Sequence, residues 1–570
     1  MISNKNEKIF KIIFKIIRIE VRGIKKMKGN KYLLSLIVIA FVIVFSISYS
    51  FAQCTIIGAG TGATVDGSTI TTHNDDSGVA DFRLWIIPEM DWPEGATRDI
   101  VVDGHNYIDY GNWPDIDYGD KAIVMEQINQ VEQTYQYLHS RYSFINANGL
   151  TMGESTFGQG NTSTDLGKEI RTVLRDDSEG IVDCWMAQDI ALERAKTARE
   201  AVRIMGDLVE EYGWYGSGEI MNISDGEEVW IAEYYGRDLW VAVRMPDDHV
   251  FVGANTARIR GIDLDDEENV MHSPNLISFA VEHGWYDPET DGPFNPADVY
   301  APRTEGYWNP REWRVIDLVA PSLAVEPYQT HYPLFVKPDN KLSVHDIFKI
   351  SGDVYRGTEF DLTKGPGAGP WGDPLGNYRI AGRERPVGIP LTCYLQVSQT
   401  KSWLPEPIKG VVWFGYGAVD STYLTPLLAS MEKLPDFYQT GSRYETFRRD
   451  SGWWVNSYVQ QMARFRYNEA IQDIYQIRDS RMESIYKQTA ALQEAAAELY
   501  ETDPEIAIKL LSDFAYNTAV DWHETWLQLG DELMGKYAFD RVRVQGDMYP
   551  EWWIDWLTRA VEEIEVVEVD

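Results

Sequence analysis

The feature that most constrains the fold of this chain is the junction between a hydrophobic leader and the cysteine that follows it. Ten Lys and Arg residues lie within residues 1–53, and an apolar run, Leu33–Phe45, follows the last of them. Small residues then lead to Ala52, next to Gln53 and Cys54. Basic, apolar and small residues in this order are typical of a secretory signal. We therefore expect the folded body to begin at Cys54, after a removable leader.

The leader allows more than one outcome. Ser50 and Ala52 fit cleavage after Ala52, which would leave Gln53 in front of the cysteine. The apolar run approaches membrane-spanning length, so an uncleaved anchor stays open. Gln53 stands where a lipoprotein signal has a small residue, which argues against lipidation, and Met27 would start a leader of ordinary length. We expect a secreted or periplasmic protein that meets the membrane only through its leader.

After the leader, short β-type runs alternate with turns. Cys54–Ile57 and Ser68–Thr72 flank a turn at Asp66-Gly67, which predicts a β-hairpin that begins at the cysteine. Further strand-like runs are Leu84–Ile87, Val229–Ala232, Trp240–Val243, Val250–Gly253 and Gly410–Phe414. Apolar residues recur with helical spacing over Ile190–Leu208.

Beyond Trp453 the composition shifts to helix formers, and Asp503-Pro504 resembles a helix N-cap followed by Pro at the first helical position. We expect an α+β body over residues 54–452 and a helical region over 453–570.

Composition excludes several classes of protein. The 570 residues can bury a large core, and a net charge of -36 would repel a nucleic acid backbone. With three cysteines the chain has no disulfide framework, and at least one thiol stays free. The oligomeric state is left open.

Three further motifs resemble cofactor or metal sites but lack the surrounding residues that such sites need. Gly58–Ala63 resembles a dinucleotide fingerprint, but strand and turn residues follow it instead of a helix. His523-Glu524 lacks the second His of a zincin helix. Asp75-Asp76 and Asp265–Glu268 lack EF-hand spacing and favour solvated acidic loops. We expect no metal and no cofactor.

Cys54 has a distinctive chemistry if it becomes the first residue. It would then carry a thiol and a free α-amine, whose reference pKa of about 7.7–8 suits a general base. An amide nitrogen inside the chain cannot take a proton, so the uncut chain should be inactive. A buried structural cysteine is the alternative interpretation.

Several segments resemble the dipeptidase A family of N-terminal-nucleophile (Ntn) cysteine hydrolases, which is related to secernins, choloylglycine hydrolases and penicillin V acylases. The similar segments are Cys54–Gly58, Ala63–Thr69, Thr72–Gly78, Val131–Leu138, Asn146–Thr156, Val229–Glu233, Val243–Asp248, Ala254–Ile259 and Gly357–Lys364. The resemblance spans residues 54 to about 460 and implies two stacked antiparallel sheets between helical layers, an αββα sandwich.

The resemblance also implies three catalytic residues. Cys54 matches the nucleophile, with its α-amine as the base. Asp76 matches an acid that orients the amine, and Asn255 matches an Asn whose side-chain N–H faces the developing oxyanion.

Four residues are implied at the substrate site: His73, Asn74, Glu154 and Ser155. The family pattern has Arg where this chain has His73, a shorter side chain that is mostly neutral at pH 7. A structural and a functional His73 are therefore both open. A second Arg, which the bile acid hydrolase relatives carry, has no assigned counterpart in the sequence.

The resemblance implies hydrolysis of dipeptides or short peptides without a cofactor. Two alternatives stay open. An acylase of the penicillin V or bile acid type would use the same chemistry on acyl-amides. A non-catalytic exported binding protein would keep the fold without the activity.

Overall fold

The computed structural model describes residues 54–78, 80–103, 122–304, 306–376, 383–444, 446–538 and 549–565. The predicted leader, with its apolar run and Gln53, lies outside these ranges. Within them, no helix combines the length and the apolar character needed to span a bilayer.

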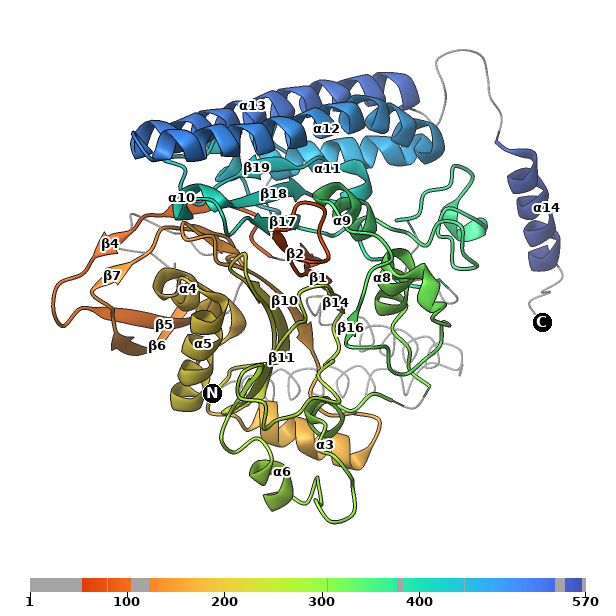
Figure 1. Cartoon of the computed structure of the whole chain (residues 1–570). Coiled ribbons are helices and arrows are strands. Elements are labelled where there is room, and N and C mark those ends of the chain that lie inside the picture. The colour runs from red at the N-terminus through yellow and green to blue at the C-terminus, as the bar shows by residue number, and fades with distance from the viewer. Residues whose placement is uncertain are drawn as a thin grey trace, which may run out of the picture. The chain divides into compact units, whose positions relative to one another are not determined.

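Two antiparallel sheets form the centre of the fold (Figure 1). The seven strands of the first sheet are, in spatial order, β16 (Phe335–Val336), β14 (Val250–Gly253), β1 (Ile56–Ala59), β2 (Thr69–Asp75), β17 (Tyr394–Thr400), β18 (Gly410–Tyr416) and β19 (Thr425–Leu427). The eight strands of the second are β15 (Val270–His272), β13 (Leu239–Arg244), β12 (Val229–Gly236), β11 (Gly218–Ser224), β10 (Thr151–Phe157), β9 (Ile145–Asn146), β8 (Tyr137–His139) and β3 (Trp85–Ile87). The hairpin predicted after Cys54 is confirmed as β1 and β2, in which Gly58 pairs with Thr71.

The two sheets stack face to face, and β2 and β10 approach each other closely. Thr71 donates to Thr151 across the interface at 2.9 Å between hydroxyl oxygens. Asn222 Nδ2 donates to Ile57 O at 2.8 Å. A Cβ at Gly153 of β10 would lie 2.3 Å from Thr72 O, so glycine is required for this approach. Polar side chains between the sheets are thus held away from water.

Helices cover the outer faces and complete the predicted αββα sandwich. On the second sheet lie α4 (Cys184–Arg194) and α5 (Ala198–Tyr212). On the first lie α9 (Val344–Ser351), α11 (Gly452–Ala463) and α13 (Pro504–Tyr537), which contact β17, β18 and β19. Helix α12 (Tyr467–Tyr500) packs beside α13, and both run along the same face (Figure 1).

The remaining elements are short or peripheral. Strand pairs β4 (Met90–Asp91) with β7 (Gln133–Thr134), and β5 (Thr97–Asp103) with β6 (Ala122–Asn129), form two small ribbons. The other helices are α3 (Asp165–Arg171), continued by a π-helical turn η1 (Thr172–Asp176), α6 (Ser278–Glu282), α7 (Pro296–Tyr300), α8 (Pro310–Val319), α10 (Glu406–Lys409) and α14 (Glu551–Glu565). Short 3-10 turns are η2 (Pro321–Leu323), η3 (Pro366–Ala368), η4 (Val419–Ser421), η5 (Asp436–Tyr438) and η6 (Arg464–Arg466).

The C-terminal helices share one hydrophobic core with the first sheet. Trp522 and Trp526 of α13 pack on Tyr423, which precedes β19, with ring centroids 4.7 and 4.8 Å away. The predicted cap is present, since Asp503 Oδ1 accepts from the backbone N–H of Ile506 at 3.2 Å. The boundary at residue 452 stays a prediction.

The structure corrects one helix. The periodic segment Ile190–Leu208 is divided between α4 and α5 by an extended residue at Thr197. Thr197 and Glu200 form a capping box that starts a new helix, and the apolar spacing resumes after it. Gly58–Ala63 is followed by a turn and β2 and not by a helix, as the residues after it predicted.

Candidate functional site

Cys54 lies two residues before β1 and is completely buried. Its Sγ donates to Glu154 Oε1 on β10 at 3.5 Å. Sγ, a ring nitrogen of His73 and a carboxylate oxygen of Asp75 lie within 4.8 Å of one another. Alternate residues of a strand face the same side, so β2 presents His73 and Asp75 to the thiol together.

His73 and Glu154 form a buried pair, with Nε2 and Oε1 3.1 Å apart. Burial alone would lower the pKa of His73, but the charge and hydrogen bonding of Glu154 outweigh it and raise that pKa above the usual value. The buried carboxylate of Glu154 thus shifts His73 toward its protonated form, an influence that the sequence alone did not indicate. The pair favours a cationic ring where the family pattern has Arg.

Glu219 of β11 lies next to Glu154. It was not identified as a site residue from the sequence. Glu154, Glu219 and Cys184 bring ligand-type atoms within 4.8 Å of one another. Burial and the charge of Glu154 raise the pKa of Glu219 well above its usual range. Burial opposes ionisation of Glu154 too, but His73 keeps the pKa of Glu154 below its usual value. The ionised form is therefore favoured at Glu154 and the protonated form at Glu219.

Asp75 completes what we call the carboxyl cluster, which consists of Asp75, Glu154 and Glu219. Burial raises the pKa of Asp75 to about 6, although His73 and Arg443 oppose the rise. Burial and the charges of Glu154 and Asp75 raise the pKa of the Cys54 thiol well above its usual value. In the intact chain the Cys54 thiol therefore keeps its proton.

Asp76 lies at the end of β2 and is buried, not in a solvated loop as the acidic pair Asp75-Asp76 suggested. Arg385 Nη2 and Thr392 Oγ1 donate to its two carboxylate oxygens at 2.6 and 2.5 Å. Burial raises the pKa of Asp76, and Arg385 opposes this rise. Sequence spacing could not reveal Arg385, which is 309 positions away. The second acidic cluster, Asp265–Glu268, does lie in a largely exposed loop.

A frame of hydrogen bonds joins Cys54 to Asn255. Ser155 Oγ donates to Cys54 O at 3.1 Å and accepts from the backbone N–H of Asn255 at 2.9 Å. Arg311 of α8 donates to Cys54 O at 2.7 Å and to Asn255 Oδ1 at 2.8 Å. Asn255 Nδ2 donates to Thr156 O at 2.6 Å. Asn255 has a φ of 61°, an uncommon conformation that Asn tolerates better than most residues.

Arg311 is a site arginine that the sequence did not reveal. Its guanidinium is nearly fully buried, and burial, together with the nearby charge of Arg385, lowers its pKa to about 10. It remains a cation at neutral pH, held 2.7 Å from the carbonyl oxygen of the candidate nucleophile.

Asn74 does not join the other predicted site residues. Its side chain donates to Ser351 O of α9 at 3.1 Å, and its backbone pairs with Thr55. It occupies the β2 face opposite His73 and Asp75. Its contacts pack β2 against α9, and the expected contact with substrate stays a prediction.

Two groups of buried side chains have the donor types and spacing of metal ligands. Cys54, His73 and Asp75 form one, and Glu154, Cys184 and Glu219 form the other. Glu154 Oε1 accepts a hydrogen bond from the Cys54 thiol and pairs with His73 Nε2, so these atoms of the two groups already engage one another. The three cysteines are all reduced.

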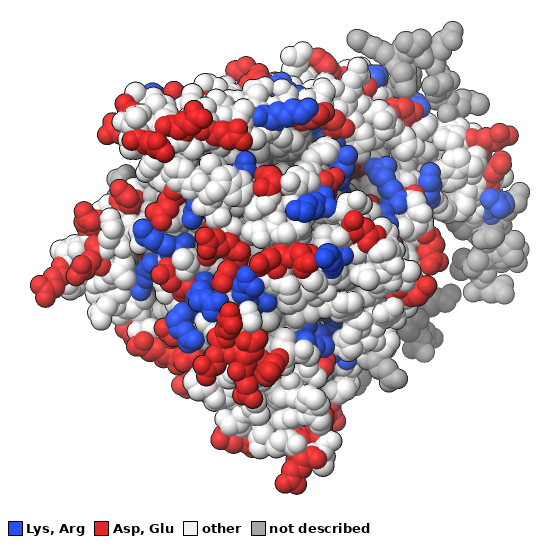
Figure 2. Space-filling model, viewed as in Figure 1, with Lys and Arg blue, Asp and Glu red and all other residues white. Residues whose placement is uncertain are grey.

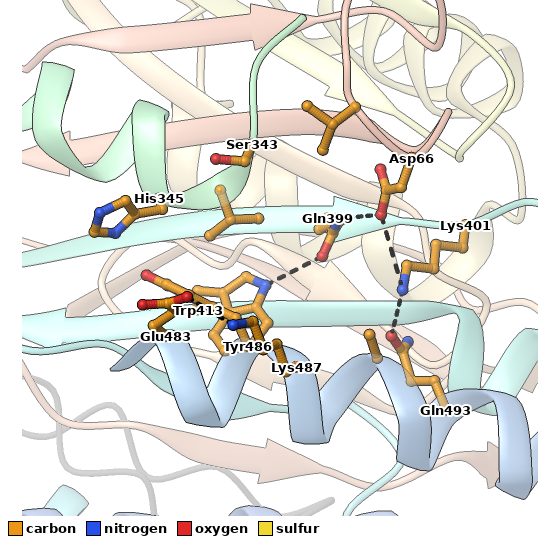
Figure 3. A pocket seen from close by; sticks show the side chains of 13 residues that line it. Asp66, Ser343, His345, Gln399, Lys401, Trp413, Glu483, Tyr486, Lys487 and Gln493 are labelled. Carbon is orange, nitrogen blue, oxygen red and sulfur yellow. Dashed lines mark hydrogen bonds and ion pairs between the residues drawn. The ribbon is translucent and has the colours of Figure 1, made fainter. Parts of the chain in front are cut away.

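Two cavities differ in their relation to Cys54. One, of about 300 Å³, is lined by Asn255, Arg311 and Arg385. The other lies between α9, β17, β18 and α12, where Lys401 lies between Asp66 and Gln493 (Figure 3). The second cavity touches none of the predicted site residues, so the first is the candidate substrate site.

Comparison with known proteins shows the family of the chain. Residues 53–480 match peptidase family C69. A "Probable dipeptidase" of Salmonella dublin is 27% identical over 400 residues, which cover 68% of this chain and 82% of the relative. The "Dipeptidase" of Bifidobacterium longum is 25% identical, with 71% and 76% coverage. "Dipeptidase A" of Lactobacillus helveticus is 23% identical, with 85% and 98% coverage. With most of its length matched and the sandwich fold present, the chain belongs to peptidase family C69.

Proposed function

We propose that this protein is an exported cysteine dipeptidase of the Ntn type, activated when its leader is removed before Cys54. The observation that carries the proposal is the frame around Cys54. Arg311 and Ser155 bind the carbonyl oxygen of Cys54, not its nitrogen. These contacts therefore survive cleavage of the preceding peptide bond, and the new N-terminal residue stays fixed beside Asn255.

Cleavage supplies the base that the uncut chain lacks. The thiol of the uncut chain is held protonated by burial and by the carboxyl cluster. A free α-amine on the same residue, with a reference pKa of about 7.7–8, can accept the thiol proton near neutrality. Asp76 would orient the resulting ammonium electrostatically, and His73 would supply positive charge near the thiolate.

The first half of the reaction forms an acyl-enzyme. The Cys54 thiolate attacks the carbonyl carbon of the substrate peptide bond, and Asn255 donates to the oxyanion. The C–N bond breaks, and the α-ammonium gives its proton to the leaving amine. In the second half, the α-amine takes a proton from water, the hydroxide attacks the thioester, and Cys54 leaves as a thiolate that is reprotonated. Each cycle consumes one water.

Three sources support the dipeptide substrate and the export step. The relatives in the family comparison are named as dipeptidases. The candidate cavity of about 300 Å³ is at the small end of ligand sites, which suits a short peptide. The N-terminal sequence has the order of a secretory leader. Signal peptidase cleavage after Ala52 would leave Gln53 in place, so a cut one bond later or a trimming step completes maturation.

The proposal is tested by assaying a dipeptide panel with wild-type protein and with Cys54→Ala, after mass analysis of the mature N-terminus. We expect Cys54→Ala to lose at least about 10⁴-fold in kcat/KM, because the nucleophile is removed. Cys393→Ala is the matched control, since this thiol is also buried and reduced but donates to Ala80 O and not to Glu154. It should retain most of the activity.

Other outcomes would point elsewhere. Cleavage of phenoxyacetyl or bile acid amides without cleavage of dipeptides would replace the dipeptidase with an acylase. Equal dipeptide hydrolysis by Cys54→Ala and wild type would contradict the nucleophile assignment.

A further inference from the structure

The cavity beside Asn255 has an unusual charge for this protein. Four of the residues that line it are arginines: Arg171, Arg175, Arg311 and Arg385. No Asp or Glu is among the described residues that line it. Elsewhere acidic side chains predominate, as the net charge of -36 requires, and red side chains are spread widely over the face in Figure 2. We call this space the arginine cavity.

Two of the arginines come from one helical segment. Arg171 ends α3, and Arg175 lies four residues later in the π-helical turn η1. Residues three to four positions apart on a helical segment project from neighbouring positions. Both side chains are partly buried. Burial, and next the charge of Arg171, lower the pKa of Arg175, with Asp176 acting in the opposite direction. The segment thus holds two like charges together at the wall of a cavity.

The other two arginines connect the cavity to the reacting groups. Arg311 contacts Cys54 O and Asn255 Oδ1. Arg385 pairs with Asp76 at 2.6 Å. Asp76 therefore supplies negative charge to one guanidinium of this wall, that of Arg385. A bound anion would reduce the repulsion between the cations.

We propose that the arginine cavity binds a carboxylate of the substrate, with Arg171 and Arg175 as its specificity-determining residues. The proposal rests on the dipeptidase function above and adds the chemical class of group that the site selects. Guanidinium groups form charge-assisted, often bidentate hydrogen bonds with carboxylates. A dipeptide has its C-terminal carboxylate close to the scissile bond, and an acidic side chain is the second source of the same group. Selection for a free carboxylate would explain preference for dipeptides over internal bonds of long chains.

The test compares substrates that differ only in one carboxylate. Ala-Ala and Ala-Ala amide differ in the α-carboxylate, whereas Ala-Glu amide and Ala-Gln amide differ in a side-chain carboxylate. Each pair is assayed with wild type, Arg171→Gln, Arg175→Gln and the control Arg203→Gln. Arg203 is an exposed arginine of α5 that pairs with Asp207 and does not line the cavity.

We expect the wild type to prefer the charged member of at least one pair. Arg171→Gln and Arg175→Gln should raise KM for that member by about tenfold, the loss expected of one charge-assisted hydrogen bond. The effect on kcat should be smaller, and hydrolysis of the uncharged member should change little. Arg203→Gln should match wild type. The pair that shows the preference identifies the source of the carboxylate.

Two failures are distinguishable. If wild type cleaves dipeptides in a Cys54-dependent manner, but the variants affect charged and uncharged members equally, the inference is wrong and the dipeptidase function stands. If wild type hydrolyses no dipeptide, the proposed function itself fails. Circular dichroism and thermal unfolding of each variant separate loss of fold from loss of binding. If one variant unfolds, the other carries the test.

Discussion

The two sides of Cys54 have opposite chemistry. On one side, between the sheets, lies the carboxyl cluster of Asp75, Glu154 and Glu219, where burial and mutual repulsion raise the pKa of Asp75 and Glu219. On the other lies the arginine cavity, where Arg311 and Arg385 hold Cys54 O and Asp76. The first side favours a protonated thiol, and the second stabilises negative charge.

Under the proposed mechanism, this difference separates two tasks that Cys54 would perform. The carboxyl cluster keeps the thiol unreactive until a base is present, so the uncut chain is protected. The arginine cavity provides the positive field in which an anionic substrate and its oxyanion would lie. The following predictions test whether the two sides act separately.

The largest effect is expected on the arginine side. Asn255→Ala removes the side chain that Arg311 and Thr156 hold in place. We expect kcat to fall by about 10²–10³-fold, the usual cost of losing one oxyanion donor. KM should change much less, which steady-state kinetics with a dipeptide can show. An Asn255→Asp variant should not restore the rate. A change confined to KM would assign Asn255 to ground-state binding.

On the carboxyl side, Asp75→Asn should change the pH dependence of stability. The pKa of Asp75 is raised from 3.8 to about 6 in the folded protein. The folded state therefore holds a proton that the unfolded state loses first, so wild-type stability falls as pH rises from about 4 to about 6. At about 1.4 kcal/mol per pKa unit, this contribution is about 3 kcal/mol.

Denaturant unfolding of the mature protein between pH 4 and 7 measures this contribution. Asp75→Asn should lose the decline, whereas Asp265→Asn, which alters an exposed loop, should keep it. Parallel curves for wild type and Asp75→Asn would show that Asp75 ionises normally.

The smallest effect is expected at Glu154, which acts through its neighbours. Glu154→Gln removes the charge that raises the pKa of His73, so that pKa should fall. Activity at pH 7 should decrease by about tenfold, less than the 10²–10⁴ of a group that transfers a proton directly. The His73 ring signal in NMR, followed across pH, gives the pKa change. An unaltered His73 titration would refute the pairing.

Local sequence patterns predicted much of the fold but less of the site. The hairpin after Cys54 and the helix that starts at Pro504 depend on nearby residues, and both were predicted correctly. The break before α5 was not predicted, because the helical spacing of apolar residues continues across Thr197, which caps a new helix. Asp75 and Asp76 were predicted to lie in a solvated loop, but both are buried. Their burial depends on how the two sheets pack, which local sequence does not show.

The arginines of the site could not be predicted from local sequence. Arg311 and Arg385 reach Cys54 and Asp76 across 257 and 309 positions of the chain, with no motif to mark them. Glu219 gains its raised pKa through burial and through contact with Glu154 on the neighbouring strand, neither of which a local motif marks. Cys54 could be singled out because its signal, a lone cysteine after a leader, is local.

The most direct test of the account compares two purified proteins, one that begins at Cys54 and one that begins at Gln53, in the same dipeptide assay. The account predicts activity only for the protein that begins at Cys54, because only there is the α-amine of the nucleophile free to act as base. Mass spectrometry before and after the assay verifies that Gln53 stays attached. Equal activity of the two proteins would contradict the Ntn mechanism.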